Sequence, residues 1–247
     1  DFADNGTIDN PIPEIMGWPG KGNPRFFEIH GFELPSTAQG LAPFSDQDGD
    51  GLYNPMAGDY PMPPRGGVIP EQLTWSVFND AGNIHSESQA DPLQVEVHLS
   101  TWAYHCADNP QLNNTIFTSY KVINRGGEQL DSLHLGLWVD FDLGCFTDDY
   151  MGSAPALNSF FAYNQDNEDD LDCESGITGY GENPPAQAVT MLNKELTYLM
   201  YYNNGSIDFP PGTTDPSIGL GYYRYLTGHW QDGTPLTIGG TGYNPSV

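Results

Sequence analysis

The stretch that decides the predicted fold is Leu130–Gly152, LDSLHLGLWVDFDLGCFTDDYMG. Every second residue from Leu133 to Leu143 is apolar. Successive side chains of a β-strand point to opposite faces of a sheet, so this period of two predicts a central strand with one buried face. The opposite face and the loop that follows carry four acidic residues, Asp140, Asp142, Asp148 and Asp149.

These four carboxylates predict a cation at the end of the strand. Held together without a counter-ion, they would raise one another's pKa and destabilise the fold. A strand predicted at Ser159–Tyr163 leads into a second acidic run, Asn164–Asp172, with five acidic residues in nine. This run is either a solvated loop or a contributor to the same cation site.

The overall charge excludes several classes of partner. The chain has 247 residues, with 33 acidic against 7 basic and a formal charge of -26. Nucleic acids and anionic membrane surfaces are poor partners, because both require clustered Lys and Arg. No apolar stretch is long enough for a membrane-spanning helix, so we expect no membrane insertion. So large an excess repels itself unless cations neutralise part of it.

The composition favours an all-β protein. Gly (29) and Pro (21) mark many turns, and 13% of the residues are aromatic. Strands are predicted at residues 73–79, 94–105 and 115–124, and the end of Ala188–Asn203 is also β-like. Short connections between them predict an antiparallel sheet. We expect an antiparallel β-sandwich or jelly-roll-like domain with long loops and one short helix at Pro216–Leu226.

Residues 1–44 are predicted to form an extended N-terminal arm, and residues 45–247 a calcium-binding β-sandwich domain. Six prolines make helices and central strands unfavourable in the arm. Its segment Arg25–Leu34, RFFEIHGFEL, alternates in part and predicts one strand. That strand either covers an edge of its own domain or joins the sheet of a neighbouring copy.

The most specific motif is DQDGDGLYNPMAGDYP, at residues 46–61. Its first three acidic residues have the spacing of positions 1, 3 and 5 of a calcium loop, and Gly51 stands where that loop turns sharply. The residue at position 12, Ala57, departs from the usual Glu. An acidic turn without metal is the alternative. The predicted Ca²⁺ ligands are Asp46, Asp48, Asp50, Asp59 and the carbonyl oxygen of Leu52.

Three cysteines allow at most one disulfide bond within the chain. We predict that Cys145 and Cys173 pair, because both flank acidic loops, and that Cys106 is a buried free thiol.

No catalytic motif emerges, and we expect a protein that is not an enzyme. The chain lacks G-x-S-x-G and H-E-x-x-H, and its six histidines do not have metal-ligand spacing. A pair of carboxylates suited to glycoside hydrolysis carries little information among 33 acidic residues. Three classes of function remain, in this order: a structural subunit or adhesin, a carbohydrate-binding module, and a hydrolase. The sugar platform of such a module could use Trp75, Trp102, Trp138 and Trp230.

The motifs taken together resemble those of large secreted Bacteroidota (Saprospiraceae-like) surface proteins exported by the type IX secretion system. The resemblance covers about residues 17–243, through GLAPFSDQDGDGLYNPMAGDYP, WSVFNDAGNIH, NTIFTSYKVINR, GLWVDFDLGCFTDDYMG and YYRYLTGHWQDGTPLTIGGTGY. It implies an extracellular, calcium-binding, β-rich protein of the cell surface. It also implies O-glycosylation at Ser132, within Asp-Ser-Leu. Assembly with copies of itself into a layer or filament is the expected function, and glycans are the alternative partner.

Overall fold

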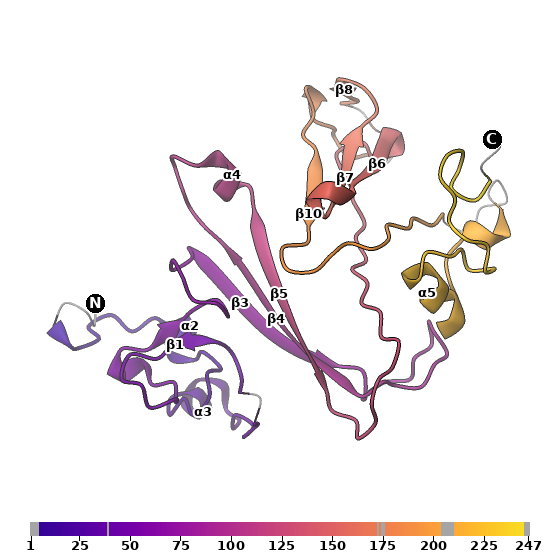
Figure 1. Ribbon diagram of the computed structural model, residues 1–247. Coiled ribbons are helices and arrows are strands. Elements are labelled where there is room, and N and C mark those ends of the chain that lie inside the picture. Colours follow the sequence, from indigo (N-terminus) through magenta and orange to yellow (C-terminus); the bar gives the residue numbers. More distant parts are fainter. Residues whose placement is uncertain (1–4, 39, 172, 174–175, 204–209, 245–247) are drawn as a thin grey trace. The chain divides into compact units, whose positions relative to one another are not determined.

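The computed structural model describes residues 5–38, 40–171, 173, 176–203 and 210–244. The chain forms two compact units, coloured along the sequence in Figure 1. The first comprises the residues up to Asn83 together with Pro92–Gln129, and the second comprises Ile84–Asp91 and the residues from Leu130 onward. All named strands pair antiparallel and the helices are few and short, which confirms the all-β, sandwich-like class predicted from the sequence.

The first unit is built on a three-stranded sheet with the order β3–β4–β5 (Figure 1). Its strands are β3 (Gln72–Asn79), β4 (Val95–Ala103) and β5 (Ile116–Asn124). These are the three strands predicted from β-branched and aromatic residues with short connections, and all three predictions are confirmed.

The N-terminal residues are helical where a strand was predicted. The helix α3 (Phe26–His30) occupies the segment RFFEIHGFEL, so that prediction is wrong. A helix places residues four apart on one face, and the rings of Phe26 and His30 lie 4.3 Å apart there. The helix ends at Gly31, whose φ of 77° suits glycine and whose N–H donates to the Phe27 carbonyl. This local end signal overrides the partial alternation.

The residues predicted to be an arm also belong to the core of the first unit. Trp18 and Ala42 form its buried cluster with Tyr53, against which Leu73 and Trp75 pack. The Tyr53 hydroxyl donates to the Ile15 carbonyl (2.6 Å). The structure therefore places no unit boundary at residue 44, although residues 1–4 and 39 of the predicted arm lie outside the description. The remaining elements of this part are α2 (Pro13–Met16), β1 (Phe44–Ser45), η1 (Pro55–Ala57), β2 (Tyr60–Pro61) and α4 (Pro110–Asn113).

The second unit contains a smaller sheet with the order β10–β7–β6. It consists of β6 (Asp149–Ala154), β7 (Ser159–Asn164) and β10 (Gln187–Thr190), and Phe160 and Ala162 of β7 are buried. The predicted strand at 159–163 is thus confirmed. The other elements are η2 (Phe146–Asp148), η3 (Pro155–Leu157), β8 (Glu168–Asp169), β9 (Gly181–Glu182), η4 (Pro211–Thr213) and α5 (Gly219–Leu226). The helix α5 confirms the predicted C-terminal helix, with a start three residues later.

The predicted central strand does not form. Residues 133–143 lie outside every strand, and the side chain of Leu135 is 70% exposed. Instead, the segment packs on α5: Gly136 lies so close to Leu226 that a Cβ at this glycine would collide with it. The His134 ring meets that of Tyr223 edge to face at 5.5 Å. Leu133 and Leu137 are also exposed, so the apolar face is largely uncovered. Alternation leads to a strand only where a neighbouring strand supplies backbone hydrogen bonds, and no described strand pairs with this segment.

The β-like end of Ala188–Asn203 is likewise not a strand beyond Thr190. Its tyrosines serve a second aromatic core instead, in which Tyr201 contacts the fully buried Trp230 at 5.4 Å. Within the described ranges, no helix is both long and apolar enough to span a bilayer.

Candidate functional site

The acidic loop at residues 46–50 folds around the side chain of Asp46. Its Oδ1 accepts the Gly49 N–H (2.7 Å) and its Oδ2 accepts the Gly51 N–H (2.9 Å). Both glycines have a positive φ, 78° and 77°, which residues with a Cβ rarely adopt. The hydrogen bond from Gly51 lowers the pKa of Asp46 from its usual value, and desolvation opposes this only in part. The loop therefore holds Asp46 in its ionised form.

Three carboxylates converge in this loop. Asp46, Asp48 and Asp50 are exposed, and each offers one oxygen within 4.8 Å of the others. Such a group could hold a metal ion. The sequence motif and the structure agree here, because all the information needed lies within five residues of chain.

Asp59 has a different role from the three loop aspartates. It is 2% exposed and is not a member of their cluster. Its Oδ1 accepts the Gln47 N–H (2.7 Å) and its Oδ2 accepts the Asn54 N–H (2.8 Å). Asp59 thus ties together the two ends of the loop. The Leu52 N–H donates to Asp50 (2.7 Å), and the Leu52 carbonyl oxygen as a ligand stays a prediction.

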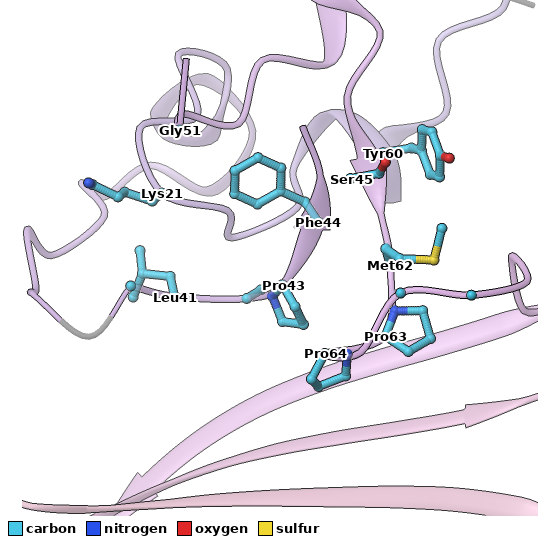
Figure 2. Close-up of a pocket in the computed structure, with 14 residues that line it drawn as sticks. Lys21, Leu41, Pro43, Phe44, Ser45, Gly51, Tyr60, Met62, Pro63 and Pro64 are labelled. Atoms are coloured by element: carbon cyan, nitrogen blue, oxygen red, sulfur yellow. The ribbon is translucent and has the colours of Figure 1, made fainter. Parts of the chain in front are cut away.

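A hollow of about 630 Å³ lies beside the acidic loop and includes Gly51 in its wall (Figure 2). Figure 2 shows Phe44 and Met62 with several prolines along this hollow. The charged side chain among its lining residues is that of Lys21. The lining thus offers no carboxylate pair and no nucleophile with an adjacent base, which are the usual requirements for hydrolysis.

The second predicted cation site assembles in part. Desolvation raises the pKa of Asp149 from its usual value, the hydrogen bond from the Leu143 N–H opposes this, and nearby carboxylates raise it further. Those neighbours are Asp148, Asp169 and Asp142. Asp140, by contrast, is an electrostatic neighbour of Tyr202 and is not among those of Asp149. Asp142 and Asp148 are therefore electrostatic neighbours of Asp149, but among the described residues these carboxylates do not converge within 4.8 Å as those of the acidic loop do.

Sequence reasoning did not single out Asp169, which is fully buried. It accepts the Cys145 N–H (3.0 Å) and the Tyr180 N–H (2.7 Å). The run Asn164–Asp172 is thus more than a solvated loop, although Asp172 itself lies outside the described residues.

The predicted disulfide joins Cys145 and Cys173, with their Cα atoms 5.6 Å apart. Cys106 is free, as predicted, but only half-buried.

Histidines and tryptophans are placed mainly by packing. His98 is 5% exposed and its Nε2 lies 2.8 Å from Glu96, which also binds Arg125 at 2.8 Å. Of the four tryptophans considered as a sugar platform, Trp230 is buried and Trp138 is 67% exposed. The other two, Trp75 and Trp102, contact His98 and Phe117 respectively.

Comparisons with known proteins give no match: no protein-family model matches the chain, and neither a curated protein nor a solved structure is similar to it. The function is therefore inferred from the chemistry of the residues themselves.

Proposed function

We propose that this protein is a non-enzymatic, extracellular structural protein, a calcium-stabilised subunit of a cell-surface layer or filament. The observation that carries the proposal is the exposed triad Asp46, Asp48 and Asp50. Its ligands are all oxygens, which favour hard cations over zinc or copper. Calcium accepts an irregular set of six to eight oxygens, some of them from water, whereas magnesium requires near-ideal octahedral geometry.

Three further features support an extracellular location. The disulfide Cys145–Cys173 is of a kind that persists mainly in oxidising compartments. Extracellular calcium modules work with dissociation constants of about 10⁻⁴–10⁻³ M, a range that an exposed loop suits. The motifs also resemble those of type IX-exported surface proteins.

Ser132, the proposed glycosylation site, is exposed at a bend with a positive φ of 54°. Intact-mass spectrometry of secreted protein tests for that glycan.

Assembly would use the open edges of the larger sheet rather than the N-terminal residues, which are partly helical. In the part of the chain that the structure describes, no further strand pairs with the outer edges of β3 and β5. Phe78 on β3 and Tyr120 on β5 are about half exposed. A sheet edge offers backbone hydrogen bonds and places for alternate side chains, so a second copy can add a strand there. Calcium would reduce the repulsion between acidic copies.

The test is calcium-dependent assembly of the full chain, followed by light scattering. Wild type should assemble in calcium and dissociate in EGTA. A loop variant, Asp46→Asn, Asp48→Asn and Asp50→Asn together, should stay dispersed in calcium. A charge-matched control alters three exposed acids outside the loop: Glu14→Gln, Asp91→Asn and Asp108→Asn. A wild type that remains monomeric in calcium, or a control that fails as the loop variant does, would refute the proposal.

A carbohydrate-binding or adhesin module is the second candidate. The observation that favours it is Trp138, whose 67% exposed ring can stack on a sugar. A glycan array separates the two candidates: selective binding lost in Trp138→Ala favours the module, and an array without binding favours the structural subunit.

A further inference from the structure

Three side-chain oxygens at the base of the β6–β7 hairpin are buried and lack any hydrogen-bond partner: Asp148 Oδ1, Asp149 Oδ1 and Asn164 Oδ1. Asp149 and Asn164 are directly opposite each other in the strand pairing. Side chains of such a pair project from the same face with Cβ atoms about 5 Å apart. Asp148 is at the same end, because its carbonyl accepts the Gln165 N–H at 3.0 Å.

The orientation of the Asn164 amide is fixed by its own contacts. Its Nδ2 donates to the carbonyl oxygens of Asp166 (3.4 Å) and Glu168 (3.2 Å). A flipped amide would place Oδ1 against two other acceptors, so the nitrogen must face them. Oδ1 is therefore directed away from that turn, and the Asp149 side chain projects from the same face of the strand pair. The residue is only 5% exposed, so bulk water does not satisfy this oxygen.

A cation accounts for these three acceptors better than a hydrogen-bond donor does. A buried acceptor without a partner destabilises the fold, and it does so more strongly when it is charged. The second unit has 18 Asp and Glu against two basic residues, Lys194 and Arg224. Arg224 donates to the Gln231 carbonyl (2.6 Å), and Lys194 is exposed. Neither basic side chain is among the charges that act on Asp149.

We propose that Asp148, Asp149 and Asn164 bind a hard divalent cation, with calcium as the best fit, at the base of the β6–β7 hairpin. Two carboxylate oxygens and one amide oxygen form a donor set that calcium uses in proteins, with water completing the coordination. Asp142 is exposed and is one of the charges that act on Asp149. This site rests on observations separate from those at the acidic loop, and it does not depend on the proposed function.

The ion would reinforce the backbone hydrogen bonds that already join the segments around it. It links η2, which ends at Asp148, to β7 at Asn164. The same short region holds Cys145, whose backbone binds Asp169 and whose side chain is in the disulfide. The cation and the disulfide therefore restrain one hairpin from two sides.

The experiment is calcium titration by isothermal calorimetry on the full chain carrying the triple loop variant, so that the loop does not contribute. One calcium should still bind. Asp148→Asn, which removes one of the two carboxylates, should weaken binding about tenfold, and Asn164→Leu should weaken it about tenfold or more. Asp140→Asn is the control, since it removes a carboxylate from the same segment that is neither one of the three oxygens nor among the charges that act on Asp149. Its affinity should stay within about threefold of the parent.

A competing outcome is a protonated Asp149 that donates to Asn164 and needs no metal. In that case the loop variant binds no calcium. Neither this parent nor the same protein with Asp149→Asn then unfolds at a higher temperature in calcium than in EGTA. That set of results would overturn the proposal. Asp149→Asn also covers the case in which Asn164→Leu fails to fold, because a cation site predicts that it loses the calcium-dependent rise in unfolding temperature.

Discussion

The variant Asp59→Asn distinguishes a brace of the acidic loop from a calcium ligand. In the structure Asp59 accepts two backbone N–H groups, from Gln47 and Asn54, at 2.7 and 2.8 Å. The Asn side chain keeps one acceptor oxygen and directs an NH₂ group at the other N–H. One hydrogen bond to a charged acceptor is therefore lost and one buried donor is left without a partner. Hydrogen bonds to charged groups contribute about 1.5–3 kcal/mol, so we expect a loss of about 2 kcal/mol in the free energy of unfolding.

The assay is thermal unfolding followed by circular dichroism, in EGTA and in calcium. For a chain of this size a loss of about 2 kcal/mol corresponds to a fall of roughly 4–8 °C in the unfolding temperature. A brace acts without metal, so the fall should appear in EGTA as well as in calcium. Asp48→Asn is the control. Asp48 is exposed, so this variant should unfold in EGTA at the same temperature as wild type. If Asp59→Asn unfolds at the same temperature as wild type in EGTA and at a lower temperature only in calcium, then Asp59 is a calcium ligand and not a brace.

Two further predictions concern the disulfide and the partly exposed ion pair of Glu96 and Arg125. Cys145→Ser with Cys173→Ser opens a loop with a sequence separation of 28, so the loop-entropy relation gives a loss of about 3.6 kcal/mol, measurable by urea unfolding. An unchanged midpoint would contradict it. Desolvation raises the pKa of Glu96, but hydrogen bonds from Arg125 and His98 outweigh it and leave the pKa below the usual 4.5. The stability from Glu96 is therefore present above pH 4.5 and is lost as the pH falls through the lowered value. Glu96→Gln should flatten that part of the pH–stability curve, and an unaltered curve would show that the ion pair is not responsible.

The strands that the sequence predicted correctly are those whose partner lies next along the chain. β3, β4 and β5 follow one another along the chain and pair in that order, so a local β-like pattern was enough to place them. The segment 133–143 has the most regular alternation in the chain, yet it lies against α5, more than 80 residues away in sequence. Its pattern gives no information about that partner. The same reasoning explains α3, where the glycine that ends the helix outweighs the alternation.

The two candidate metal sites differ in the same way. Asp46, Asp48 and Asp50 are brought together by turns within their own loop, so spacing alone predicts the cluster. The second cluster requires Asn164 to face Asp149 across a hairpin, which depends on strand register. Nothing in the sequence distinguishes Asn164 as a ligand, because the pattern that indicates a metal site there is the series of acidic residues around it.

The proposed function depends on calcium binding by the acidic loop, and equilibrium dialysis measures that binding. Wild type and the triple variant of Asp46, Asp48 and Asp50 are dialysed against about 1 mM calcium, within the range of extracellular sites. Salt at about 0.15 M screens the general attraction of a chain with a formal charge of -26. If the loop is a calcium site, wild type should bind one calcium ion more per chain than the triple variant. Equal amounts of bound calcium in the two proteins would contradict it.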